Sequence, residues 1–231
     1  MRLPTRRLPG FLVRTLLVGA AALGLILHIV ETRNLLQLFS YYTIQSNLLV
    51  FLVFFVLLAR DVQGKPETRF LVLARGAATL AIQVTFLVSH FLLRSPGDPL
   101  LPHKPSTLLV HYLVPVLTLV DYLVADAKGR LRLADPLAWA LVPLAYPVYV
   151  LVYVRLGGRF SYGASTTKVP YFFLDVERLG LLGVAGWILA ITAGFMVLAY
   201  MLVGLDRLLG RREAHRVGAK DGSPVREAEP G

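Results

Sequence analysis

The stretch YYTIQSN occupies residues 41–47 and opens a segment that is almost wholly apolar from Leu48 to Leu58. Its polar side chains stand where lipid-facing residues would be expected: Thr43, Gln45, Ser46 and Asn47. In hydrocarbon an unsatisfied polar group is costly, so such groups face the protein interior. Polar residues inside membrane segments commonly mark functional sites. We therefore expect this stretch to form one wall of a pocket near the outer surface.

The composition is typical of a multi-pass membrane protein. The chain has 231 residues, of which 56% are hydrophobic and 16% charged, and its mean hydropathy is +0.64. Apolar runs that cross a bilayer need ~20 residues each, which leaves no room for a separate soluble domain of ordinary size. Cysteine is absent, which excludes disulfides, a cysteine nucleophile and thiolate metal sites.

Six apolar runs predict an all-α polytopic bundle of six transmembrane helices. The first run lacks a small-x-small cleavage site, so we expect a retained span and not a signal peptide. A basic N-terminus (1–10) precedes the six-helix domain (11–205), and a disordered tail (206–231) follows it. The expected spans are about 11–30, 41–60, 70–93, 106–125, 136–154 and 179–205.

The distribution of charge orients the bundle. Six spans put both termini on one side, and 17 of the 24 Lys and Arg residues fall on that side. Because basic residues gather on the cytoplasmic side, both termini are expected in the cytoplasm and the chain in the inner cell membrane. The net charge of +10 is explained by this topology, and we predict no nucleic-acid partner. The expected partners are membrane lipids.

With this topology, three histidines from different spans lie at the same outer depth as Thr43: His28, His90 and His111. Thr43 and Asn47 are four residues apart and share a helical face, and Gln83 and His90 share another. Independent spans thus bring imidazole, hydroxyl and amide groups to one level, which favours a common pocket.

His111 lies four residues before Pro115, which has no N–H and therefore cannot bond the carbonyl of His111, so we expect a free backbone acceptor beside the histidine. Asp121 is ten residues further on, about 15 Å along a helix axis, which is too deep to orient the His111 ring. The Tyr171–Phe173 cluster is expected to be an aromatic belt at the membrane interface.

A threonine hydroxyl becomes a nucleophile when an adjacent base takes its proton, and histidine is the usual base. Thr43 and His111 are the candidate catalytic pair. The candidates for binding the developing oxyanion are Gln45, Ser46 and Asn47. Asp175, at the mouth of the last span, is the first-choice carboxylate to assist the imidazole. A site at this depth would suit an amphiphilic ester whose acyl chain stays in the bilayer.

Other interpretations remain open on the sequence alone. Thr43 could bond only its own helix, His28 and His90 could sit at the wet interface, and Asn47 could serve helix packing. A non-enzymatic transport or lipid-binding protein would need a polar path that includes Asp121. A haem or metal protein would use His28, His90 and His111, but the sequence predicts no metal site or cofactor. No G-x-S-x-G, H-E-x-x-H, C-x-x-C or P-loop motif occurs.

Three stretches carry a family resemblance: YYTIQSNLLV (41–50), HYLVPVLTLVDYL (111–123) and VPYFFLDV (169–176). In this order they resemble a group of uncharacterised bacterial six-helix membrane proteins over nearly the whole chain except the tail. That group is remotely similar to the eukaryotic androgen-induced and androgen-dependent transmembrane proteins, threonine hydrolases that cleave fatty acid esters of hydroxy fatty acids. The resemblance implies a six-helix fold and puts the catalytic pair on Thr43 and His111. The eukaryotic proteins lack the QSN run, so the resemblance gives residues 45–47 no role and leaves the substrate open.

Overall fold

The computed structural model describes residues 8–124, 128–162 and 165–221. It contains six helical segments that are long and apolar enough to cross a membrane, which is compatible with a multi-pass integral membrane protein. Three of these segments are built from consecutive helices. The third consists of α4 (Arg69–Leu87) and η2 (Val88–Leu92), the fourth of α5 (Pro105–Leu108), η3 (Leu109–Leu113) and α6 (Val114–Val124), and the fifth of α7 (Asp135–Trp139) and α8 (Leu141–Arg155). The six segments are Leu8–Glu31 (α1), Tyr42–Val62 (α3), Arg69–Leu92 (α4 and η2), Pro105–Val124, Asp135–Arg155 and Val176–Arg211 within α9 (Val176–Asp221).

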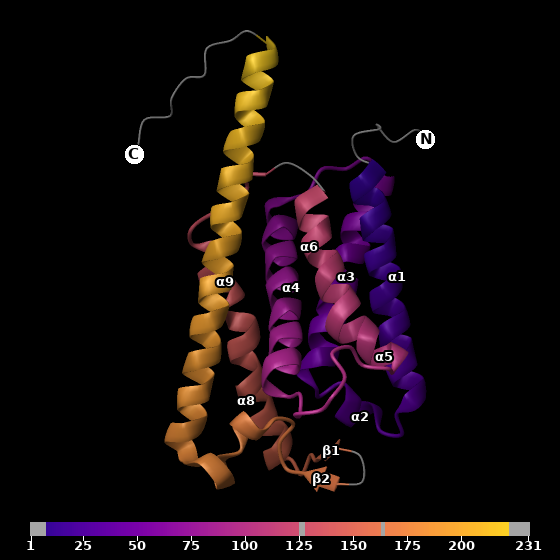
Figure 1. The fold of residues 1–231 in the computed structure, drawn as a ribbon, viewed down its shortest axis with the longest axis vertical. Coiled ribbons are helices and arrows are strands. Elements are labelled where there is room, and N and C mark those ends of the chain that lie inside the picture. The colour runs from indigo at the N-terminus through magenta and orange to yellow at the C-terminus, as the bar shows by residue number, and fades with distance from the viewer. Residues whose placement is uncertain (1–7, 125–127, 163–164, 222–231) are drawn as a thin grey trace.

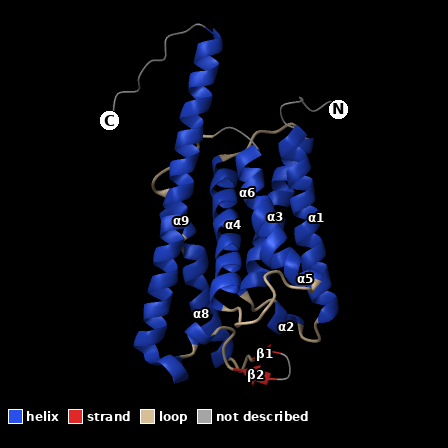
Figure 2. Ribbon diagram, in the orientation of Figure 1, coloured by secondary structure: helices blue, strands red, loops and turns tan. Residues whose placement is uncertain are grey.

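The helices form a bundle in which α1, α3, α4 and α6 pack around one another, while α8 and α9 lie beside α4 (Figure 1). The start of α1 and the last turns of α9 lie at the same end, which we call the basic end. The opposite end, which carries Thr43 and His111, is the histidine end. The short helix α2 (Leu35–Leu38) and a hairpin of β1 (Phe160–Tyr162) and β2 (Ser165–Thr167) lie there (Figure 2). Apart from this hairpin, all regular structure in the described residues is helical.

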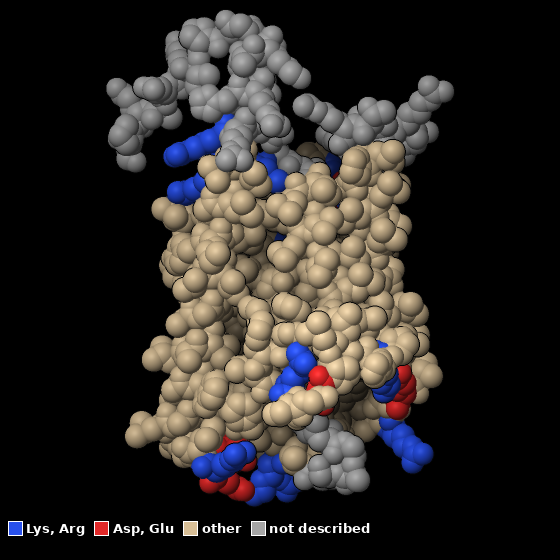
Figure 3. All heavy atoms as spheres, in the orientation of Figure 1, with Lys and Arg blue, Asp and Glu red and all other residues tan. Residues whose placement is uncertain are grey.

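Charge follows the same division. On the face shown in Figure 3, nearly all visible Lys, Arg, Asp and Glu side chains lie toward the two ends, and a broad uncharged band separates them. Large apolar side chains such as Leu16, Phe55 and Leu189 are more than half exposed along the outside of the helices. This pattern is the one expected for a surface that faces lipid, because water-facing surfaces rarely expose large contiguous apolar areas.

Two π-helical turns occur at the histidine end, Val88–Leu92 (η2) and Leu109–Leu113 (η3), and each contains a histidine. In a π turn the N–H of one residue bonds the carbonyl five residues earlier, as Val114 does with Leu109. The next donor in the chain is Pro115, which has no N–H, so the carbonyl of Val110 is free. The side-chain amide of Asn47 donates to that carbonyl at 3.1 Å. The carbonyl that was expected to be free is that of His111. The π turn moves the free carbonyl to Val110, because its hydrogen bonds span five residues instead of four.

The predicted disordered tail from residue 206 is wrong for its first part. The helix α9 continues to Asp221, and of the predicted tail only 222–231 lie outside the described residues. Asp206 is 2% exposed, and its carboxylate accepts hydrogen bonds from the Tyr122 hydroxyl and the Leu131 N–H. These contacts attach α9 to the rest of the basic end, so the helix has a reason to extend past the apolar run. A hydropathy profile cannot show these contacts, because they join residues that are far apart in the chain.

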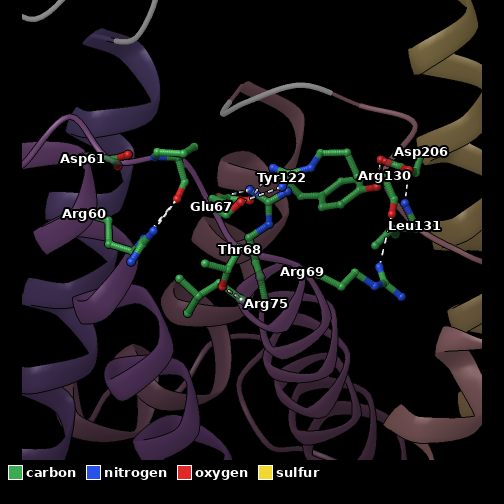
Figure 4. Close-up of polar contacts among 12 residues, drawn as sticks. Arg60, Asp61, Glu67, Thr68, Arg69, Arg75, Tyr122, Arg130, Leu131 and Asp206 are labelled. Atoms are coloured by element: carbon green, nitrogen blue, oxygen red, sulfur yellow. Dashed lines mark hydrogen bonds and ion pairs between the residues drawn. The ribbon is translucent and has the colours of Figure 1, made fainter.

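A buried ionic cluster also holds the basic end together. The Arg14 side chain on α1 is 1% exposed and pairs with carboxylates from three other segments, at 2.8–2.9 Å: Asp61, Glu67 and Asp121. Glu67 pairs in addition with Arg75 and Arg130 (Figure 4). Three guanidinium groups therefore meet three carboxylates, which balances the charge that burial would otherwise penalise. In the sequence, Arg14 and Arg75 are two of the 17 basic residues on the side expected to be cytoplasmic, and no spacing pairs Arg14 with Asp121.

The contact between α4 and α7 gives a first testable prediction. The indole of Trp139 is 1% exposed and donates to the carbonyl of Leu73 at 2.9 Å. A Cβ on Gly76 would lie 2.3 Å from Trp139 Cζ2, so Gly76→Ala should force the ring to move and cost about 1–3 kcal/mol. Thermal unfolding in detergent micelles measures this loss.

Gly19→Ala is the matched control, because Gly19 lies in α1 with nothing within 4 Å of an added Cβ. This substitution should leave the protein as stable or raise its stability by up to ~1 kcal/mol, the helix-propensity difference between the two residues. Equal unfolding temperatures for Gly76→Ala and Gly19→Ala would contradict the close packing of Trp139.

Candidate functional site

The structure brings Thr43 and His111 together. Thr43 lies in the first turn of α3, and His111 lies in the middle of the π turn η3. The distance between Thr43 Oγ1 and His111 Nε2 is 3.3 Å. This is within hydrogen-bonding reach, although the residues are 68 positions apart in the chain.

The other ring nitrogen of His111 sets the direction of this bond. His111 Nδ1 is 3.2 Å from the carbonyl oxygen of Thr107. A carbonyl can only accept, so Nδ1 carries the proton and Nε2 presents its lone pair to Thr43. The Thr43 hydroxyl therefore donates to Nε2, the arrangement that a general base requires before it removes the proton. A backbone carbonyl thus holds the imidazole in the position for which the sequence analysis proposed a carboxylate.

Thr43 lines a cavity of about 60 Å³ enclosed by α3, α4, α8, α9 and the segment before α9. The polar side chains on its wall are hydroxyls, and they come from five helices and the segment before α9: Tyr42, Thr43, Thr85, Ser89, Tyr146, Tyr171 and Thr192. The rest of the wall is apolar and includes Pro143 and Pro147 of α8. The cavity could therefore enclose a small polar group in otherwise apolar surroundings.

A second, larger hollow lies directly beside this cavity. It has a volume of about 500 Å³ and runs between the π-turn end of α4 and the middle of α9. Its walls carry only apolar residues, such as Phe91, Trp187 and Leu198. Val84, Val88 and Ile191 line both hollows, so the groove and the cavity share a wall. We call this second hollow the α4–α9 groove.

Tyr171 is a site residue that the sequence analysis missed. Its hydroxyl interacts with Thr43 and with the Tyr146 hydroxyl. Burial raises the pKa of Tyr171 to about 12, and the hydrogen bonds with Thr43 and Tyr146 only partly offset this effect. The phenol is therefore protonated at neutral pH beside the Thr43 hydroxyl. No local spacing links positions 171 and 43, so only the tertiary structure reveals the contact.

The expected interface belt at residues 171–173 is wrong for two of its three members. Tyr171 is 8% exposed and Phe173 is 6% exposed, and both line the cavity. Only Phe172, at 37%, faces outward. The segment folds back over the start of α3, where its rings fill the space between α8 and α9.

The three predicted oxyanion donors are occupied by other contacts. Asn47 is fully buried, and its amide nitrogen donates to the carbonyls of Thr43, at 2.7 Å, and of Val110. Ser46 Oγ lies 3.1 Å from the Thr43 carbonyl and 2.7 Å from Thr85 Oγ1. Gln45 donates to the carbonyl of Phe39. These side chains position the first turn of α3 against α4 and η3, and their donors point away from the Thr43 hydroxyl.

The remaining predicted pocket residues make contacts of their own. His28 Nδ1 bonds its own helix at Gly24, and Gln83 bonds the Pro115 carbonyl and the Thr118 hydroxyl. His90 Nδ1 lies 3.1 Å from the hydroxyl of Tyr112. None of these hydrogen bonds is made with Thr43 or His111.

Asp175 lies at the mouth of the last span, as expected, and its contacts there are with the backbone of α9. One of its carboxylate oxygens accepts the N–H groups of Glu177 and Arg178, so it caps the first turn of α9. Within the described residues, no group of three His, Cys, Asp or Glu side chains is arranged to hold a metal ion.

The inner end of the site is closed by packing. A buried apolar cluster that includes Val50, Phe54, Ile82 and Val114 lies between the Thr43–His111 pair and the Arg14–Asp121 pair. Along α3 it occupies the positions between Asn47 and Asp61. Asp121 is fully buried and does not line the cavity, which argues against the continuous polar path that a transport function would need.

Comparisons with known proteins do not identify a function for this chain. No protein-family model, no curated protein and no solved structure matches the chain. The resemblance to threonine hydrolases therefore stays an expectation, and the contacts around Thr43 carry the functional proposal.

Proposed function

We propose that the protein is an intramembrane hydrolase of lipid esters, in which Thr43 is the nucleophile and His111 is the general base. The observation that carries the proposal is the 3.3 Å contact between Thr43 Oγ1 and His111 Nε2, with Nδ1 held by the Thr107 carbonyl. In this tautomer the imidazole accepts the threonine proton as the oxygen attacks an ester carbonyl. The protonated imidazole then gives that proton to the leaving alcohol, and water releases the acyl group from Thr43.

The cavity that Thr43 lines and the groove next to it favour an amphiphilic ester as substrate. The small cavity accommodates a polar ester group, and the adjoining α4–α9 groove is apolar throughout. An acyl chain in this groove would keep its contacts with apolar surroundings while the ester group reaches Thr43. This arrangement fits a substrate that arrives laterally from the membrane.

The orientation of the protein forms part of the same proposal. Both ends of the described chain lie at the basic end of the bundle, and the excess of Lys and Arg on that side supports a cytoplasmic location for it. The dyad would then act in the outer leaflet of the inner membrane. The substrate class is accordingly a membrane-resident ester that is accessible from that leaflet.

A fluorophosphonate probe tests the nucleophile directly, because it reacts covalently with activated hydroxyl groups. The wild-type protein in detergent micelles should be labelled, Thr43→Ser should keep labelling, and Thr43→Ala should lose it. Thr15→Ala is the matched control, since Thr15 is an exposed residue of α1 outside the cavity, where its hydroxyl donates to the Phe11 carbonyl. Equal labelling of Thr43→Ala and wild type would remove Thr43 as the nucleophile.

A further inference from the structure

Tyr42 has a buried hydroxyl with no hydrogen-bond partner among the described residues. The residue is 8% exposed and lines the cavity together with its neighbour Thr43. A buried hydroxyl without a partner costs free energy in the resting protein, and most such groups are paired. An unpaired donor at the wall of a reaction cavity is therefore a candidate for binding the substrate.

The other two tyrosines of the cavity wall, and Asn47 in the same turn of α3 as Thr43, have hydrogen-bond partners. Asn47 donates both of its amide hydrogens to backbone carbonyls. The hydroxyl of Tyr146 donates to the carbonyl of Ser40 at 3.1 Å, and Tyr171 is bonded with Thr43 and Tyr146. Tyr42 is thus the tyrosine of the cavity wall whose O–H remains available for a ligand.

Packing fixes the position of this hydroxyl. The Tyr42 ring meets the Tyr146 ring edge to face, with centroids 5.1 Å apart and planes at 71°. The shared cavity has a volume of about 60 Å³, room for only a few water-sized groups. A carbonyl group in contact with Thr43 Oγ1 would fill much of that space, and its oxygen would lie among the hydroxyl-bearing walls.

We propose that the Tyr42 hydroxyl donates a hydrogen bond to the ester carbonyl oxygen and stabilises the negative charge that develops there. The inference rests on the proposed function and gives that reaction its oxyanion donor. As the Thr43 oxygen forms a bond to the carbonyl carbon, the threonine proton passes to His111 Nε2 and the carbonyl π electrons move onto oxygen. When the intermediate collapses, the carbonyl re-forms, the bond to the leaving oxygen breaks, and that oxygen takes the proton from His111. Tyr42 keeps its own proton throughout and donates only a hydrogen bond.

Tyr42→Phe tests this role, because it removes the hydroxyl and keeps the ring. Hydrolysis of p-nitrophenyl octanoate by the full-length protein in micelles should show kcat reduced about 10²- to 10³-fold, the usual effect of losing one oxyanion donor. KM should change little, because the bond strengthens as charge develops. The rate of fluorophosphonate labelling should fall with kcat, since the phosphoryl oxygen takes the place of the carbonyl oxygen. The unfolding temperature should not fall, because the deleted hydroxyl has no partner to lose.

Tyr153→Phe is the control, since it makes the same chemical change on α8, where the hydroxyl bonds Arg159 outside the cavity. It should hydrolyse the ester at the wild-type rate. Wild-type kcat in Tyr42→Phe, with Thr43→Ala inactive, would overturn the role of Tyr42 and leave the dyad in place. Full activity and labelling in Thr43→Ala would overturn the proposed function, and the role of Tyr42 would fall with it.

Discussion

Thr43→Ala, His111→Ala and the double variant are expected to lose ester hydrolysis to the same extent, roughly 10⁴-fold or more in kcat. The physical reason is that the two side chains act as one unit. A threonine without a base is a weak nucleophile, and a base without the threonine has no proton to take. Once either side chain is missing, removal of the second should cost little further. The measurement is kcat for p-nitrophenyl octanoate in micelles for all four proteins.

His111→Gln separates chemistry from packing in this experiment. Glutamine can keep a hydrogen bond to Thr43 but cannot serve as a base near neutral pH, so it should be as inactive as His111→Ala and closer to wild type in stability. Losses in the two single variants that multiply in the double variant would show that Thr43 and His111 act independently. Such a result would contradict the dyad despite the 3.3 Å contact.

Arg14→Ala is expected to be the most destabilising single substitution at the basic end, at about 3–5 kcal/mol. The guanidinium is 1% exposed and pairs with Asp121 at 2.9 Å through its Nε. Its removal would take the guanidinium partner away from Asp121, which is fully buried. It would also remove one ion-pair partner each from Asp61 and Glu67. Thermal or denaturant unfolding of purified protein in detergent micelles measures the effect.

Arg132→Ala is the matched control, since it removes the same charge from an exposed side chain and should change stability by no more than ~0.5 kcal/mol. The pair Arg14→Met with Asp121→Leu should be more stable than Arg14→Ala alone, because replacing both partners leaves no stranded charge on Asp121. An Arg14→Ala protein as stable as Arg132→Ala would mean that the cluster contributes nothing to the fold.

The sequence by itself determined the coarse architecture. Hydropathy over runs of ~20 residues depends on neighbouring positions only, so it located six spanning segments and the polar opening of the second one. Counting basic residues gave an expected orientation. Resemblance singled out Thr43 and His111 before any distance was known.

Other conclusions depended on contacts between segments that are distant in the chain. The occupied donors of Gln45, Ser46 and Asn47 depend on where α4 and η3 lie, and helical spacing on α3 cannot reveal this. The same holds for Tyr171, which reaches Thr43 only because its loop folds over the start of α3.

At the basic end, Arg14 and Asp121 are 107 positions apart. From the sequence, Arg14 counts toward the charge bias and Asp121 is an acidic residue too deep to orient His111. The tertiary structure made them partners, since a buried charge is tolerated only where an opposite charge is held against it. At the histidine end, the residues of the stretch YYTIQSN have different roles, and only the packing of the helices assigns them. Thr43 faces His111, and the Tyr42 hydroxyl at the cavity wall has no partner among the described residues. The side chains of residues 45–47 hold the helix that carries both, because buried amide and hydroxyl groups bond whichever carbonyls and hydroxyls the fold places nearest.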